Sequence, residues 1–430
     1  MGEFCPPLFY IFLSKNFFKK FRFVSDSGKY HMLKQIALGS VKSLSNQILN
    51  GRLIYILIGL WMIVRLTEYS TIIVSNHSAF HYQLKINKIL CILFVLFYLY
   101  KWIFDSKDKL NLICCLFFVV VCCCLRKLSC TTLVFDLFFI PLFLCQFLDK
   151  KTFYKYVLLS LCLFLLIIIS LYFFGFTHDL ANFTRQTGTS RYAFGLRHPN
   201  SLGFCAVLFC FFYVLLKENI KSYDFLLFIA LAYFCYKVPN SMTSSALIIL
   251  LTVCGICFKL FLGKPLSKRH NLLILFLYLS FVALVVFFTY YISFTETFKS
   301  YLLNMPGSIW ARFELGRKGY EMFGFTLFGK FYEFHSVIND IIKTTGPVYV
   351  WLVLDCAYFF IPIVHGVIVF LIFLAMLIWS LIRGVLSHKY LYALIIFIVV
   401  LYGVSENVIF SAVMMPVFAY TFFSSVKDKS

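Results

Sequence analysis

A polar decapeptide, Arg191–Asn200, stands directly before an apolar run that extends over residues 201–216. It carries Arg191, Arg197 and His198. Guanidinium groups bind phosphate and carboxylate through paired hydrogen bonds, and a helix that begins beside them adds backbone N–H donors. Cations at the edge of an apolar segment are costly unless they meet an anion or water. The pattern therefore predicts a site for an anionic group, phosphate in particular.

The decapeptide also has a structural interpretation. Pro199 restricts His198 to an extended backbone, and Asn200 is a favoured type of residue at a helix N-cap. A capping turn explains Pro199 and Asn200, but it does not explain why Arg191 and Arg197 accompany His198. We therefore expect a helix to begin here and an anion to bind beside its first turn.

Two carboxylates lie where apolar segments begin or end, Asp355 within Leu354–Tyr358 and Glu406 shortly before the chain's last apolar run. A carboxylate at such a depth is costly without a partner, and burial raises its pKa toward neutrality. Asp355 is therefore either the structural partner of an arginine or a general base. Glu406 and His198 are the other candidate bases, and the neighbouring Arg197 favours the neutral form of His198.

Several kinds of chemistry are excluded by missing motifs. The sequence has no Walker-type phosphate loop, no glycine-rich dinucleotide fingerprint and no Asp-x-Asp pair to hold a metal with a nucleotide sugar. Five of its sixteen cysteines lie in the apolar stretch 114–124, without the spacing of a zinc site. We expect no metal, no cofactor and no disulfide framework.

Composition indicates an all-α polytopic membrane protein. Hydrophobic residues make up 62% of the 430 positions and charged residues only 13%, and several apolar runs match the roughly 20 residues that cross a bilayer. The net charge of +21 lies in short loops between these runs, so we expect contact with membrane lipid rather than nucleic acid. About twelve spans are predicted: 52–74, 87–104, 110–125, 131–148, 154–176, 200–216, 224–237, 243–262, 271–292, 348–383, 390–404 and 407–425.

The basic loops alternate along the chain, which sets the predicted orientation. Residues 1–50 form a cytoplasmic tail, or an extension upstream of a start at Met32, and residues 51–425 form the membrane domain. Residues 426–430 form a second cytoplasmic tail. Two long loops, 177–200 and 293–347, then face the outside. Positive charge is selected against in short outer loops, and the alternative is that long loops escape this selection, so that their arginines are merely solvated. We expect a binding role for the arginines there: Arg185, Arg191, Arg197, Arg312 and Arg317.

An ordered set of short motifs, over roughly residues 170–425, resembles the O-antigen and capsular polysaccharide polymerases (the Wzy type) and the related O-antigen ligases. One departure concerns the residue after Asp355, which is often Asn in that family and is Cys356 here. The matching motifs are Arg191-x-x-Phe-Gly-x-x-His-Pro-Asn200, Ser241–Ser245, Ile309-Trp-Ala-Arg312, Leu327-Phe-Gly329, Leu354-Asp-x-Ala-Tyr358 with Gly366, and Tyr402-Gly-x-x-Glu406.

The resemblance implies an enzyme of the bacterial cytoplasmic membrane that joins oligosaccharide repeat units carried on undecaprenyl pyrophosphate. It implies a flippase and a chain-length regulator of the same pathway as partners. Asp355, His198 and Glu406 become the candidate catalytic residues. The candidate substrate-binding residues are Arg185, Arg191, Arg197, Asn200, Arg312 and Tyr358. Two alternatives stay open, a ligase that transfers finished glycan to another acceptor and a transporter of the lipid-linked oligosaccharide. Few deep charges and no clear internal repeat favour an enzyme over a transporter.

Reporter fusions test the orientation. Fusions after residues 190, 320 and 430 should report outside, outside and inside respectively, because the basic loops alternate through the chain. An outside C-terminus would mean that one span has been miscounted, and the most suspect region is near Arg126, whose charge disagrees with the alternation.

Overall fold

The structure is a computed structural model, and it describes residues 53–75, 77–104, 148–179, 183–184, 190–261, 266–295, 308–329 and 354–422. Contacts divide the chain into two units, Met1–Ile54 and Tyr55–Ser430. Almost all described residues belong to the second unit, which contains every candidate site residue. Arg185 and the predicted spans 110–125 and 131–148, apart from Leu148, lie outside the described residues.

The described residues are mostly helical. The longer helices are α3 (Leu53–Leu66), α5 (His77–Phe104), α8 (Lys150–Phe173), α9 (Pro199–Lys217), α10 (Ser222–Lys237), α11 (Met242–Phe261), α12 (Lys268–Phe294), α14 (Ser308–Phe323), α17 (Val367–Leu386) and α18 (Tyr390–Ser405). The short elements are η1 (Thr67–Tyr69), α4 (Thr71–Ser75), α16 (Ala357–Phe360), η2 (Ile361–His365), η3 (Asn407–Phe410), η4 (Ala412–Met414), α19 (Met415–Ala419) and η5 (Tyr420–Phe422).

Apolar helices support the assignment to the membrane proteins. Among the described residues, five helices are long and apolar enough to cross a membrane: Lys150–Phe173, Pro199–Lys217, Met242–Leu260, Lys268–Phe294 and Val367–Leu386. Large apolar side chains on their surfaces remain uncovered, such as Leu166 on α8 and Phe276 on α12, each 65% exposed. Such surfaces are unfavourable in water and suit a lipid environment.

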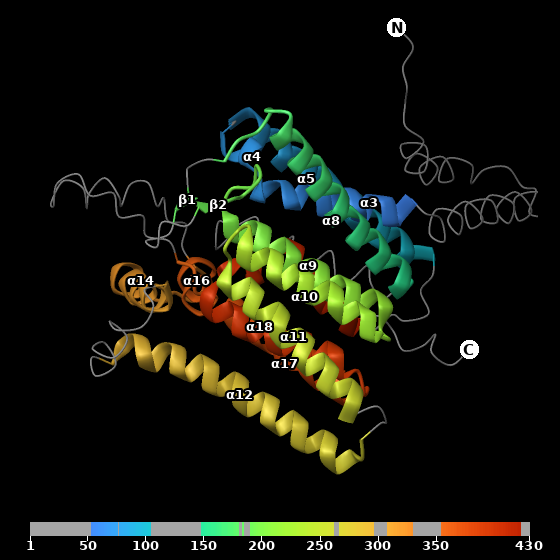
Figure 1. Ribbon diagram of the computed structural model, residues 1–430, viewed down its shortest axis with the longest axis vertical. Helices are drawn as coiled ribbons and strands as arrows, with labels where there is room; N and C mark the ends of the chain where they lie inside the picture. The colour runs from blue at the N-terminus through green and yellow to red at the C-terminus, as the bar shows by residue number, and fades with distance from the viewer. Residues whose placement is uncertain are drawn as a thin grey trace, which may run out of the picture. The chain divides into compact units, whose positions relative to one another are not determined.

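Helix α9 is the most enclosed of these five helices. It packs against α8, α10, α11 and α18, and Figure 1 shows α9, α10, α11 and α18 running beside one another. Its aromatic side chains Phe204, Phe211 and Phe212 are at most 1% exposed. Gly203 lets the next element approach closely, because a Cβ there would lie 2.6 Å from the Ser241 Oγ. The buried position of α9 fixes the place of the decapeptide that precedes it.

Several predicted spans have different boundaries in the structure. The first predicted span, 52–74, divides into α3, η1 and α4, and Arg65 Nη1 forms an ion pair with Glu68 Oε1 at 2.7 Å. Helix α5 begins at His77, ten residues before the predicted span. The last predicted span, 407–425, consists of short 3-10 and α-helical segments as far as Phe422. The predicted outer loop 293–347 contains the helix α14.

The predicted span 348–383 is broken at Gly366. Pro362 lies in the π-helical turn η2, and Gly366 follows with φ +96° and ψ 159°. Backbone N–H groups just after this break donate to the Leu327–Gly329 motif region, Val367 N to Thr326 O (2.8 Å) and Ile368 N to Leu327 O (3.1 Å). The break therefore joins two motifs that are far apart in the sequence.

Substitution of Gly366 tests this contact. Gly366→Ala should lower the free energy of unfolding by about 3 kcal/mol, because a Cβ would overlap the Gly329 backbone and the backbone conformation suits only glycine. Gly324→Ala is the matched control, since its φ is +68° but no atom lies within 4 Å of the added Cβ. The Gly324→Ala substitution should lower the free energy of unfolding by only about 1–2 kcal/mol. Thermal unfolding of both variants in detergent measures the difference, and equal losses would contradict the proposed overlap.

Candidate functional site

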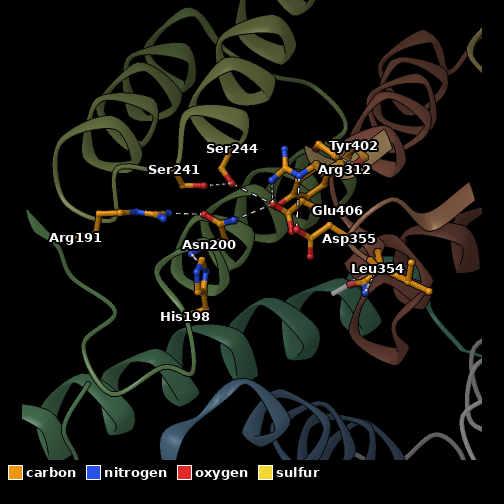
Figure 2. Close-up of polar contacts among 12 residues, drawn as sticks. Arg191, His198, Asn200, Ser241, Ser244, Arg312, Leu354, Asp355, Tyr402 and Glu406 are labelled. Atoms are coloured by element: carbon orange, nitrogen blue, oxygen red, sulfur yellow. Dashed lines mark hydrogen bonds and ion pairs between the residues drawn. The ribbon is translucent and has the colours of Figure 1, made fainter. Parts of the chain in front are cut away.

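Five side chains from four separate motifs meet in one polar cluster, which Figure 2 shows. The Arg312 guanidinium donates to Glu406 Oε1 at 2.9 Å, and its Nε lies 3.8 Å from Asp355 Oδ2. The same Glu406 oxygen accepts from the Asn200 amide nitrogen at 2.9 Å. The side-chain oxygen Oδ1 of Asn200 in turn accepts from the Arg191 guanidinium at 2.6 Å. The cluster thus contains two cations, two carboxylates and one amide that links them.

An amide is well suited to the position of Asn200. It accepts from Arg191 and donates to Glu406 at the same time, whereas a carboxylate would repel Glu406 and an ammonium would repel Arg191. The predicted N-cap role of Asn200 is wrong. His198 is the N-cap residue of α9, with φ −152° and ψ 147° as expected before Pro199, and its Nδ1 accepts from the Asn200 N–H. The Asn200 side chain is therefore released from capping and serves the cluster.

The chain before α9 is held in place from two sides. The short strands β1 (Phe183–Thr184) and β2 (Ser190–Arg191) pair antiparallel, and the Arg191 Nε donates to Pro239 O at 3.0 Å. Asp179 accepts from the N–H groups of Ala193 and Gly195 at 3.1 and 3.0 Å. These bonds fix the turn that leads from Arg191 to the start of α9.

Arg312 reaches the cluster from α14, a helix that was not predicted from the sequence. Gly319 allows close packing, because a Cβ there would lie 2.7 Å from Leu354 Cδ2, and Gly316 packs in the same way against the Phe359 ring. Leu354 directly precedes Asp355. The two glycines therefore bring the helix that carries Arg312 against the segment that carries Asp355.

Glu406 lies at the C-cap of α18, just beyond the apolar part of that helix. The next residue, Asn407, donates from its side chain to Leu354 O at 2.9 Å, which holds the Asp355 segment beside Glu406. A chain of hydroxyl groups lies nearby. Ser241 Oγ donates to Ser244 Oγ at 3.0 Å, and Ser244 Oγ lies 3.3 Å from the Tyr402 hydroxyl.

Burial and charge shift the titration of three groups. Burial raises the pKa of Glu406 to about 7, and the Asp355 charge adds to the rise while Arg312 opposes it. Burial also raises the pKa of Asp355, against the opposing effect of Arg312. Burial lowers the pKa of His198 to about 4, together with the positive charges of Arg191, Arg197 and Arg312. At neutral pH, His198 is therefore uncharged, and Glu406 is near the midpoint of its titration.

The remaining predicted site residues lie elsewhere. Tyr358 is fully buried, and its hydroxyl donates to Val400 O at 2.7 Å, so it fixes α16 to α18 instead of facing a substrate. Arg197 is exposed and has none of the contacts that form the cluster. Arg317 forms an ion pair with Glu321 on the same helix, with 3.6 Å between Nη1 of Arg317 and Oε1 of Glu321.

The structural role of Asp179 was not predicted from the sequence. The available signal was that Asp179 is the only acidic residue in the predicted outer loop 177–200. As for a metal, no three His, Cys, Asp or Glu side chains gather as ligands within the described residues.

Comparison of the chain with models of protein families, with curated proteins and with solved structures gives no match in any of the three.

The raised pKa of Glu406 predicts a pH dependence of stability. Between about pH 4.5 and pH 7, the folded protein keeps a proton that the unfolded chain releases, so this group makes the free energy of unfolding fall as pH rises. His198 acts in the opposite direction, because its folded pKa is lowered. The test therefore compares the stability of a Glu406 variant with that of the wild type at each pH, so that the contribution of His198 cancels. Glu406→Gln should gain stability relative to the wild type as pH rises from 5 to 8, measured by thermal unfolding in detergent.

The control for this measurement is Glu321→Gln, which removes a carboxylate from α14 whose side chain is 54% exposed. Its stability relative to the wild type should not change over the same pH range. If Glu406→Gln behaves like this control, the Glu406 carboxylate does not titrate near neutrality.

Proposed function

We propose that this protein is a membrane glycosyltransferase that polymerises oligosaccharide repeat units carried on undecaprenyl pyrophosphate. The supporting observation is the convergence of separate motifs in one cluster. Arg191 and Asn200 precede or begin α9, Arg312 lies on α14, Asp355 precedes α16, and Glu406 ends α18. These motifs are the ones that carry the resemblance to the polysaccharide polymerases, and a shared cluster is what a common reaction site requires.

In the proposed reaction, a hydroxyl group of an incoming lipid-linked unit attacks the anomeric carbon of the growing chain. The new C–O bond forms as the bond to the pyrophosphate breaks, and a base takes the hydroxyl proton. Negative charge develops on the departing pyrophosphate. Preorganised cations stabilise such charge strongly where water is scarce. Arg312 and Arg191 supply these cations, and direct displacement would invert the anomeric configuration.

Asp355 is the best placed of the three candidate bases. Its side chain is 34% exposed, whereas that of Glu406 is 10% exposed and Oε1 of Glu406 already accepts from both Arg312 and Asn200. His198 has its Nδ1 occupied by the Asn200 N–H, and a pKa of about 4 makes it a weak base. We assign proton transfer to Asp355 and assign the orientation of Arg312 to Glu406.

An apolar groove of about 290 Å³ includes two residues that are close in sequence to residues of the cluster. Phe313 in its wall directly follows Arg312, and Val404 lies two residues before Glu406. A polyprenyl chain has the chemistry to occupy such a groove while its pyrophosphate reaches the arginines. The groove is lined by Phe281, Leu284, Val285, Phe288, Thr289, Ile292, Phe313 and Val404.

The finer parts of the proposal follow from the predicted orientation. With about twelve spans and both termini in the cytoplasm, the cluster faces the outer side of the bacterial cytoplasmic membrane. Substrates there are already activated by their pyrophosphate link. The enzyme would then work with a flippase that delivers the lipid-linked units and a regulator that sets chain length.

Purified protein with a defined lipid-linked repeat unit tests the assignment of the base. Asp355→Asn should lose turnover by about a hundredfold or more while binding of the lipid-linked unit persists, because the amide keeps the shape but cannot take a proton. Glu406→Gln should lose less turnover, since Arg312 keeps Asp355 as a partner. The control Glu321→Gln should keep full activity, because its carboxylate has no contact in the cluster.

Two outcomes would contradict parts of the proposal. If Asp355→Asn polymerises normally and His198→Ala does not, then His198 is the base. If both variants and Glu406→Gln remain active while an assay of lipid flipping shows transport, then the protein is a transporter and not a polymerase. Transfer of a finished glycan to a different acceptor, without polymerisation, would indicate a ligase.

A further inference from the structure

A second cavity, of about 340 Å³, lies at the other end of the helices that carry the polar cluster. Helix α9 begins at the cluster and ends at Lys217, next to the cavity residue Glu218, and α11 ends beyond Lys259. Helix α18 runs the opposite way, from the cavity at Tyr390 to the cluster at its C-cap. The two sites are therefore separated by the length of an apolar helix.

Positive charge exceeds negative charge at this second cavity. Lys259 and Lys389 line it, together with one carboxylate, Glu218. Glu218 pairs with Lys150, and also with Lys389 at 3.5 Å. The Lys259 ammonium donates to the Ser222 hydroxyl at 3.3 Å. Because a hydroxyl is neutral, this contact does not compensate the positive charge of Lys259. Two lysines thus share the Glu218 carboxylate, Lys259 adds a further positive charge, and the cavity keeps a positive potential that favours an anion.

Much of the remaining wall is apolar or aromatic, beside the polar side chains of Asn219 and His388. Val214, Leu215, Phe225, Phe258 and Leu391 contribute carbon surface. Such a wall gives a freely soluble anion little to bind, whereas an amphiphile can place its headgroup at the lysines and its first methylene groups against the apolar side chains.

We propose that this cavity, the basic pocket, binds the phosphate headgroup of an acidic phospholipid. Basic pockets between membrane helices are a recurrent way of binding such headgroups. The predicted orientation places the pocket in the inner leaflet, on the side opposite the proposed reaction site. The proposal does not depend on the proposed polymerase activity, because it rests on the lining of a different cavity.

Lipid-dependent stabilisation of the full-length protein tests the proposal. The purified protein in detergent is mixed with phosphatidylglycerol, with phosphatidylcholine or with inorganic phosphate, and its thermal unfolding and retained lipid are measured. We expect phosphatidylglycerol alone to raise the unfolding temperature clearly. In the double variant Lys259→Ala/Lys389→Ala, retention of phosphatidylglycerol should fall at least threefold, while Lys259→Arg/Lys389→Arg should retain it because the charges remain.

The matched control is Lys151→Ala/Lys268→Ala, which removes the same charge from exposed positions at the starts of α8 and α12 that do not line the pocket. It should retain phosphatidylglycerol as the wild type does. Equal loss in the control and in the pocket variant would overturn the proposal in favour of general surface charge. Equal protection by inorganic phosphate, or by phosphatidylcholine, would overturn the assignment to an acidic lipid. If the alanine pair does not fold, failure of the arginine pair to retain the lipid would also overturn it.

Discussion

Glu406 is a nearly buried carboxylate at the end of an apolar helix, and its pairing with Arg312 organises the surrounding structure. A charge in such a place is costly unless partners satisfy it. Arg312 and Asn200 both donate to the same oxygen of Glu406. Arg312 must therefore approach from α14, and α9 must begin where its second residue can reach Glu406. The positions of Arg191 and Asp355 follow, because they contact Asn200 and Arg312 respectively.

Close helix approach is the second requirement, and small residues meet it. Gly316 and Gly319 let α14 lie against the segment around Leu354 and Phe359. Gly366 interrupts what would otherwise be one long helix and brings its backbone against the Leu327–Gly329 region. Larger side chains at these positions would push Arg312 away from the carboxylates, since buried interfaces have little spare volume. The glycines of these motifs therefore have a packing role, whichever reaction the cluster performs.

The two ends of the central helices differ in chemistry. The cluster of two arginines, two carboxylates and an amide lies at the start of α9 and the end of α18. The opposite ends of these two helices adjoin the basic pocket around Lys259 and Lys389. An apolar helix cannot hold such groups in its membrane-spanning middle without cost. Polar function is thus confined to the helix ends, and the packing of the helices couples the positions of both sites.

The sequence determined the class of protein and most helices, because hydropathy and length are local properties: the predicted span 271–292 lies within α12. It also identified candidate functional residues, which are Arg191, Arg312, Asp355 and Glu406. Only the tertiary structure decided their partners, since the bonds of Glu406 to Arg312 and Asn200 join segments that helix packing brings together. The same holds for Asn200, which the local pattern assigned to a helix cap. A pattern that is read along the chain reports secondary structure and burial, whereas side-chain pairing is fixed by contacts between distant segments.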